Sequence, residues 1–158
     1  MKIRLIPIVA VCLLAALCIS CGKPAERFDF IYTPESFCDT SVFRFEMMMD
    51  EPESIYSTRI ACRYNASKIP GDRIPVLVAV ISPEGKKYCE SVDLPLSPSF
   101  EKVRIRKCGG SVVDIDWPYR DRIVPGADTG MWQVAIRPID RSMLPGIYGM
   151  GFAYKIKR

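Results

Sequence analysis

The chain has 158 residues, with 22 lysines and arginines against 18 aspartates and glutamates, and it contains no histidine. The lack of histidine excludes His-based acid–base catalysis, nucleophiles activated by histidine, and imidazole metal ligands. The modest net charge of +4 makes nucleic acid an unexpected partner, because nucleic-acid binding needs a strongly basic surface.

The first 20 residues have the pattern of a secretory signal. A short basic head precedes an apolar run over residues 5–19, which is shorter than the ~20 residues of a membrane-spanning helix. The run ends in Cys18-Ile19-Ser20-Cys21, which resembles the lipobox of bacterial lipoproteins with Cys18 in place of the usual leucine. This resemblance implies that Cys21 becomes the acylated first residue. The alternative is an ordinary signal peptide that is cut near Ser20 and leaves Cys21 as a thiol.

The chain is expected to have three parts. Residues 1–20 are the lipoprotein signal peptide, residues 21–28 are a lipid-anchored tether, and residues 29–158 are a single domain. Because two or more acyl chains hold a protein firmly on a bilayer, we expect the mature protein to stay on its membrane.

Alternation of apolar and polar residues predicts the first strands of the domain. The pattern gives strands over residues 43–47 and 56–64. Residues 75–81 are apolar on both faces, which predicts a central, well-covered strand. A turn at residues 82–85 then leads into a partner strand over residues 86–94, since its proline presets φ and its glycine accepts a left-handed conformation.

The second half of the domain continues this pattern. Residues 102–106 predict a strand whose basic face protects a sheet edge rather than forming a binding site. Further strands are expected over residues 113–117 and 132–136, followed by a loop or one helical turn at residues 138–144. Residues 148–156 form the longest alternation, and small residues on its opposite face allow a ring or backbone to pack close: Gly149, Gly151 and Ala153.

These segments amount to about eight strands without a convincing amphipathic helix, which predicts an all-β fold. We expect an antiparallel β-sandwich of jelly-roll or immunoglobulin-like type. An up-and-down barrel is the alternative.

The seven cysteines divide by position. Two leave with the signal, and Cys21 is the candidate anchor. The remaining four allow disulfides in three connectivities that the sequence does not distinguish, and these four are Cys38, Cys62, Cys89 and Cys108. The alternative is that some or all are buried apolar residues, and Cys62 is in phase with the inward face of its strand. No C-x-x-C pair occurs, which argues against a zinc site, so we expect no metal and no cofactor.

Trp117, Tyr119 and Arg120 form the strongest candidate contact cluster, because these residue types are enriched at interaction hot spots. The alternative places Trp117 in the core and the other two in a loop. The three methionines at residues 47–49 suggest either a soft contact surface or two core residues around an outward Met48.

Asp114 and Asp116 share one face of a predicted strand, where a hard cation such as Ca²⁺ could find oxygen ligands. Their spacing is not that of an EF-hand, and no carboxylate pair stands out as that of a glycosidase. We therefore interpret both as solvated residues and predict no catalytic residue.

Several patches of the sequence follow the order found in the gliding-motility lipoprotein H (GldH) family. The patches that carry this resemblance are Phe37-Cys38-Asp39-Thr40-Ser41-Val42-Phe43, Arg63-Tyr64-Asn65, Ser82-Pro83-Glu84-Gly85, Tyr119-Arg120, Gly130-Met131-Trp132-Gln133-Val134 and Leu144-Pro145-Gly146-Ile147-Tyr148-Gly149-Met150-Gly151. The chain departs from the family's pattern where a Gly-rich segment is reduced to Gly109-Gly110, and where Gly149-Met150-Gly151 replaces Asp-Val-Gly.

The resemblance implies an outer-membrane lipoprotein of Bacteroidetes-type bacteria that assists gliding or type IX secretion. No run of acidic residues follows Cys21, and in that phylum such a run resembles a cell-surface export signal, so the periplasmic face is expected. The expected role is a non-enzymatic interaction module with envelope proteins as partners. The alternative is a lipid- or sugar-binding lipoprotein, which an enclosed apolar pocket would favour and a core filled by aromatic side chains would disfavour.

Overall fold

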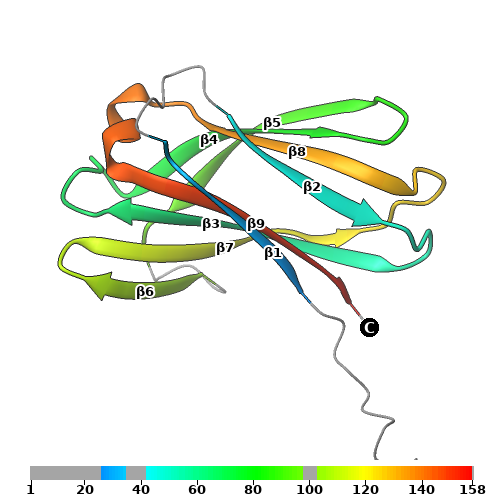
Figure 1. The fold of residues 1–158 in the computed structure, drawn as a ribbon, viewed down its shortest axis with the longest axis horizontal. Coiled ribbons are helices and arrows are strands. Elements are labelled where there is room, and N and C mark those ends of the chain that lie inside the picture. Colours follow the sequence, from blue (N-terminus) through cyan, green and yellow to red (C-terminus); the bar gives the residue numbers. More distant parts are fainter. Residues whose placement is uncertain (1–25, 35–41, 98–102, 158) are drawn as a thin grey trace, which may run out of the picture.

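Two antiparallel sheets packed face to face make up the protein (Figure 1). The computed structural model describes residues 26–34, 42–97 and 103–157, so Cys21 and Cys38 lie outside the described residues. Its elements are β1 (Arg27–Tyr32), β2 (Phe43–Met49), β3 (Ile55–Asn65), β4 (Arg73–Ile81), β5 (Lys87–Pro95), β6 (Arg104–Gly109), β7 (Val112–Ile123), β8 (Gly130–Pro138), the 3₁₀ helix η1 (Arg141–Gly146) and β9 (Ile147–Lys157). No helix within these ranges has the length and apolar character needed to cross a membrane.

The strand order identifies the sandwich as a jelly roll. One sheet has the order β1-β9-β3-β7-β6 and the other β2-β8-β4-β5. Apart from β6, the strands pair in a nested way: β1 with β9, β2 with β8, β3 with β7, and β4 with β5. The predicted antiparallel sandwich is therefore confirmed in its jelly-roll form. Neither sheet closes on itself, so the up-and-down barrel is wrong.

Strand β1 was not predicted, although its sequence alternates regularly. Phe28, Phe30 and Tyr32 lie on one face, with Asp29 and Ile31 on the other. The strand begins at residue 27, so the last two residues assigned to the tether belong to the five-stranded sheet. The nearby lipobox favoured a tether here, and pairing with the distant strand β9 is what holds this segment as a strand.

Strand β7 runs farther than predicted, through Pro118 to Ile123. Tyr119 and Arg120 therefore lie in a strand, and their interpretation as a loop is wrong. The neighbouring strand β6 pairs with β7 only as far as Asp116. Beyond Asp116, β7 has a neighbouring strand on one side only. A proline, which has no backbone N–H, is tolerated at such a sheet edge.

The core between the sheets is filled with aliphatic and aromatic side chains. The ring of Phe45 stacks on that of Phe152, with centroids 5.9 Å apart. Met47 and Met49 are buried and Met48 is half-buried, so the interpretation of the methionine run as core residues around an outward Met48 is confirmed. A filled core is the arrangement that disfavours a ligand held inside the fold.

Strand β4 is central, as predicted, because it lies between β8 and β5. Its inward residues Ile74, Val76 and Val78 are fully buried. Its outward residues Leu77 and Ala79 are only half-buried, so the prediction of cover on both faces is wrong. The reason is that no second layer packs on the outer face of this two-layer sandwich.

Candidate functional site

The outer face of the five-stranded sheet carries a groove of about 610 Å³, which we call the aromatic groove. The strand register places five outward residues in one row across the sheet, namely Tyr32, Gly149, Arg63, Asp114 and Arg106. The neighbouring row contains Phe30, Gly151, Ala61, Asp116 and Arg104. Each row runs from an aromatic ring on β1, over a small residue on β9, to an arginine on β6. At ~4.8 Å per strand, the groove spans about 19 Å from β1 to β6.

The aromatic wall consists of Phe28, Phe30 and Tyr32. The ring of Phe30 lies 6.2 Å from that of Phe28 and 5.0 Å from that of Tyr32, centroid to centroid. Phe28 is 53% exposed and Tyr32 is 62% exposed. Phe30 between them is half-buried. A contiguous set of aromatic rings on a solvent-facing surface is uncommon and often marks a binding surface.

The glycines of β9 are what allow these rings to lie on the sheet. A Cβ at Gly149 would stand 2.5 Å from Phe30 Cε1 and 2.7 Å from the backbone oxygen of Ile31. The three atoms nearest to a Cβ at Gly151 would all be ring atoms, the nearest being Phe28 Cε2 at 2.8 Å. The expectation that this small-residue face admits a ring is therefore confirmed.

We expect Gly149→Ala to lower the free energy of unfolding by ~1–3 kcal/mol, because the new methyl group meets backbone that cannot move aside. Gly151→Ala is the matched control and should lower the free energy of unfolding by less than ~1 kcal/mol, because flexible rings can shift aside. Replacing glycine also reduces the conformational entropy of the unfolded chain, which offsets part of the loss. Urea denaturation of the two variants checks this. A larger loss for Gly151→Ala than for Gly149→Ala would contradict this account of the wall.

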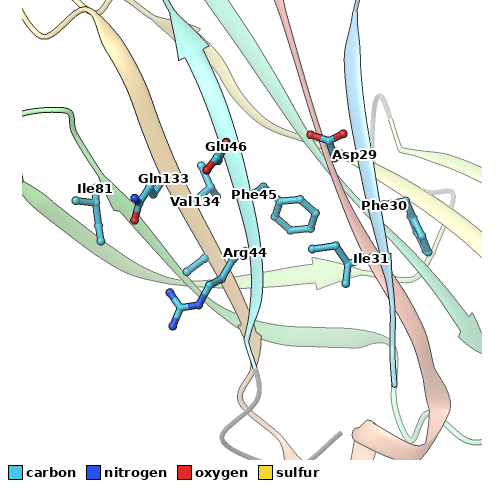
Figure 2. A pocket seen from close by; sticks show the side chains of 10 residues that line it. Asp29, Phe30, Ile31, Arg44, Phe45, Glu46, Ile81, Gln133 and Val134 are labelled. Atoms are coloured by element: carbon cyan, nitrogen blue, oxygen red, sulfur yellow. The ribbon is translucent and has the colours of Figure 1, made fainter. Parts of the chain in front are cut away.

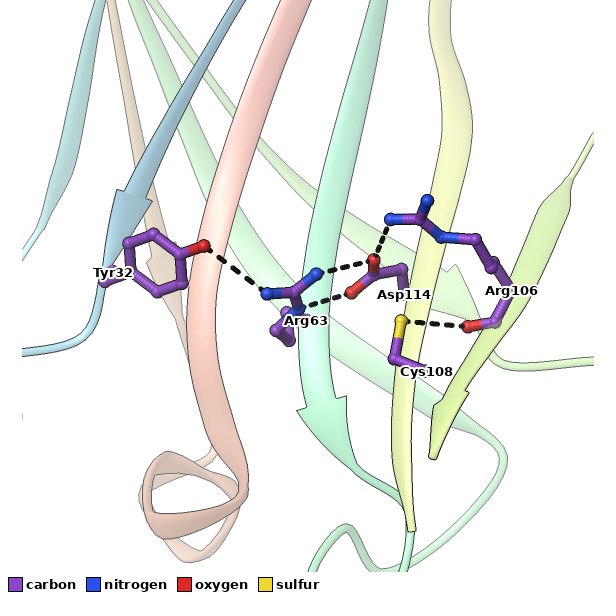
Figure 3. Close-up of polar contacts among 5 residues, drawn as sticks. All are labelled: Tyr32, Arg63, Arg106, Cys108 and Asp114. Atoms are coloured by element: carbon purple, nitrogen blue, oxygen red, sulfur yellow. Dashed lines mark hydrogen bonds and ion pairs between the residues drawn. The ribbon is translucent and has the colours of Figure 1, made fainter. Parts of the chain in front are cut away.

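The opposite wall is a ladder of charged side chains (Figure 3). Arg63 donates from Nε and Nη2 to the two oxygens of Asp114, at 2.6 and 2.8 Å, and from Nη1 to the Tyr32 hydroxyl at 3.3 Å. Arg106 donates to the same carboxylate at 2.6 Å. Hydrogen bonds from Arg63, followed by those from Arg106, hold the pKa of Asp114 well below its usual range. Asp114 is therefore a saturated acceptor rather than a free cation ligand.

A second charged cluster lies beside the ladder and is only partly satisfied. Arg59 bridges Asp116 at 2.7 Å and Glu26 at 2.9 Å. Arg59 Nε and Asp116 Oδ1 are nevertheless buried and lack a hydrogen-bond partner among the described residues. Burial raises the pKa of Asp116 above its usual value. One donor and one acceptor thus stay unpaired in side chains that line the groove.

The predicted contact cluster divides between the core and the surface. Trp117 is 2% exposed and donates from Nε1 to the carbonyl oxygen of Pro95, so its ring cannot meet a partner. Tyr119 is half-buried and donates to Glu90, and the exposed Arg120 pairs with the same carboxylate. The Tyr119 hydrogen bond, with the Arg120 pair, lowers the pKa of Glu90. Only Arg120 of the three presents an exposed side chain.

The cysteines that the structure describes carry free thiols: Cys62, Cys89 and Cys108. Cys62 is buried, as its alternation predicts, and burial raises the pKa of its thiol. Cys108 lies on the outer face near the charged ladder, where its Sγ contacts the Arg106 carbonyl oxygen at 3.7 Å (Figure 3). Cys89 is exposed on the other sheet. These three residues therefore lie in different places, and the predicted disulfides among them are not formed.

A second surface lies where the edges of the two sheets meet, and we call it the edge cleft (Figure 2). It has a volume of about 540 Å³. Asp29 and Ile31 point from β1 towards β2, whereas Phe30 points to the opposite side. Because Phe45 of β2 packs on Phe152 of β9, strand β1 extends beyond the edge of the four-stranded sheet. The inward face of β1 is thus uncovered.

Within the described residues no group of three or more cysteines and carboxylates is placed to hold a metal ion. No protein-family model matches the chain, and no curated protein matches it.

Proposed function

We propose that the chain is a non-enzymatic, lipid-anchored interaction module of a bacterial envelope assembly, held on the periplasmic face of the outer membrane. Its export signal and lipobox support the location, and the resemblance to the GldH family supports a role beside gliding or type IX secretion machinery. The lack of histidine supports a non-enzymatic role. The interior is filled and the sheets stay open, so this role is better supported than a lipid or sugar held inside a barrel.

The observation that carries the proposal is the free edge of β2 beside the edge cleft. Met48 donates its backbone N–H to the Tyr154 hydroxyl of the other sheet, at 3.1 Å, so this N–H points away from β8. In an antiparallel strand, every second residue directs both its backbone N–H and its C=O group to the same side. The N–H and C=O groups of Glu46 and Arg44 therefore also point to the free edge.

A strand from a partner protein fits this edge. It would pair with the outward backbone groups of Arg44 and Glu46 and would cover Ile31, which is 37% exposed on β1. Strand addition of this kind supplies affinity through main-chain hydrogen bonds, and pockets between the strands supply specificity. The charges of Arg44 and Glu46 protect the edge against self-association when no partner is bound.

A photocrosslinking residue at position 44 is expected to capture a specific envelope protein in living cells, identified by mass spectrometry. The control places the same residue at position 93, on the edge strand β5 of the same sheet. Glu46→Pro should leave thermal unfolding unchanged and abolish the adduct, because proline removes an N–H that points away from the ladder. Adducts that are absent, equal at position 93, or retained in Glu46→Pro would contradict the proposal.

A further inference from the structure

We propose that the aromatic groove is a binding site for an acidic saccharide chain. This site shares Phe30 with the lining of the edge cleft, but its other rings, Phe28 and Tyr32, lie on the opposite face of β1 from Asp29 and Ile31. The ligand class follows from three features of the groove: its rings, its excess of donors and its charge.

The rings offer flat apolar surface at the rim of a polar groove. Phe28 and Tyr32 are more than half exposed, and the rings of Phe28 and Phe30 lie directly against Gly149 and Gly151. A pyranose ring has a face of C–H groups that packs on an aromatic face, while its hydroxyl groups project from the rim. A saccharide therefore matches a surface on which apolar rings and charged groups lie side by side.

The polar side of the groove has more donors than acceptors. A guanidinium has five N–H donors, and Arg63 uses three of them on Asp114 and Tyr32. Arg106 is largely exposed, and Arg104 lies opposite Asp116, whose carboxylate it influences by its charge. The Asp114 oxygens are occupied by Arg63 and Arg106. The unused N–H donors of these arginines are therefore complementary to a ligand that carries acceptor oxygens.

Because the groove carries a net positive charge, it favours a ligand whose acceptor oxygens are anionic. Four guanidinium groups face three carboxylates, a net charge of +1, and these residues are Arg59, Arg63, Arg104, Arg106, Glu26, Asp114 and Asp116. A planar guanidinium binds a carboxylate more strongly than it binds a neutral oxygen. Sugars with a carboxylate, such as uronic acids, combine this group with the ring.

Calorimetric titration of the lipidated mature protein in detergent micelles tests the proposal with three probes. These are a galacturonate hexamer, the neutral cellohexaose, and a glutamate hexamer with the charge but no sugar rings. We expect the galacturonate hexamer to bind at least about tenfold more tightly than either control, because only this probe uses both the rings and the guanidinium groups.

Variants then locate the binding. Tyr32→Ala should weaken galacturonate binding about tenfold or more, since it removes an exposed ring of the wall. Arg104→Gln should weaken galacturonate binding to a similar extent and leave cellohexaose unaffected. The matched controls are Tyr88→Ala, an exposed ring on the other sheet, and Arg44→Gln in the edge cleft, and neither should change the affinity.

Three results would overturn the saccharide site: no binding of the galacturonate hexamer, equal binding of the glutamate hexamer or cellohexaose, or affinity that Tyr32→Ala leaves unchanged. The edge-cleft proposal is tested independently, because Glu46→Pro should abolish partner capture and leave galacturonate binding intact. Loss of one activity without the other therefore shows which of the two surfaces has been assigned correctly.

Discussion

Cys21→Ala is expected to abolish incorporation of a palmitate analogue and to remove the protein from the outer-membrane fraction. The thiol of this residue is the acyl acceptor that the predicted lipobox implies, and each buried CH₂ of an acyl chain contributes ~0.8 kcal/mol to membrane binding. Without the acceptor thiol, the labelled band should fall by about a hundredfold or more, and the protein should leave the membrane because the acyl chains that supply its membrane affinity are missing. Metabolic labelling followed by membrane fractionation on a density gradient measures both quantities.

Cys18→Leu is the matched control for this experiment. It changes a cysteine in the same four-residue motif to the usual lipobox residue, so labelling and outer-membrane location should be retained or increased. Labelling that persists in Cys21→Ala would contradict the lipoprotein assignment. The same conclusion would follow if the wild-type protein were recovered soluble with an unmodified residue 21.

Trp117→Ala is expected to lower the free energy of unfolding by ~3–5 kcal/mol, because it removes one of the two buried tryptophans of a filled core. The hydrogen bond to the Pro95 carbonyl oxygen, which ties β7 to the end of β5, is lost as well. Domains of this size are stable by only ~5–15 kcal/mol, so much of the molecule would be unfolded at modest urea concentrations. Urea denaturation followed by tryptophan fluorescence of the remaining Trp132 measures the change.

Tyr88→Ala provides the comparison for Trp117→Ala. Tyr88 stacks on Trp132 at 6.5 Å but is 52% exposed, so its loss should cost about 1 kcal/mol or less. If Trp117→Ala kept its full stability and lost a binding partner instead, the ring would belong to a contact surface after all. The residue would then have the role that the sequence first suggested for it.

The positions of Trp117 and Tyr119 could have been predicted better from the sequence. Both residues continue the alternation of Val113 and Ile115, which places all four side chains on one face of the strand. The enrichment of tryptophan, tyrosine and arginine at interfaces favoured a contact cluster, and Pro118 favoured a break in the strand. In this sheet the proline lies where the strand has only one neighbour, so the strand continues and the inward phase is kept.

The aromatic groove was only partly predicted from the sequence. Asp114 and Asp116 were correctly placed on one face, but their interpretation as solvated side chains missed the arginines that pair with them. Those arginines come from β3 and β6, and the rings of the opposite wall come from β1. The small residues of β9 indicated that a ring would pack there, yet nothing local identified Phe28 and Phe30, which precede them by more than 100 positions in the chain.

The amino-acid sequence by itself determined that this chain forms strands, and which side chain of each strand faces inward, because a period of two is a local property of the backbone. It is also the basis for predicting an export signal, because such signals are read as linear sequence. Only the tertiary structure decided which strands are neighbours and in what register. Backbone hydrogen bonds are chemically the same for every pair of strands, so the choice depends on how all the inward side chains pack together. That choice created both the aromatic groove and the edge cleft.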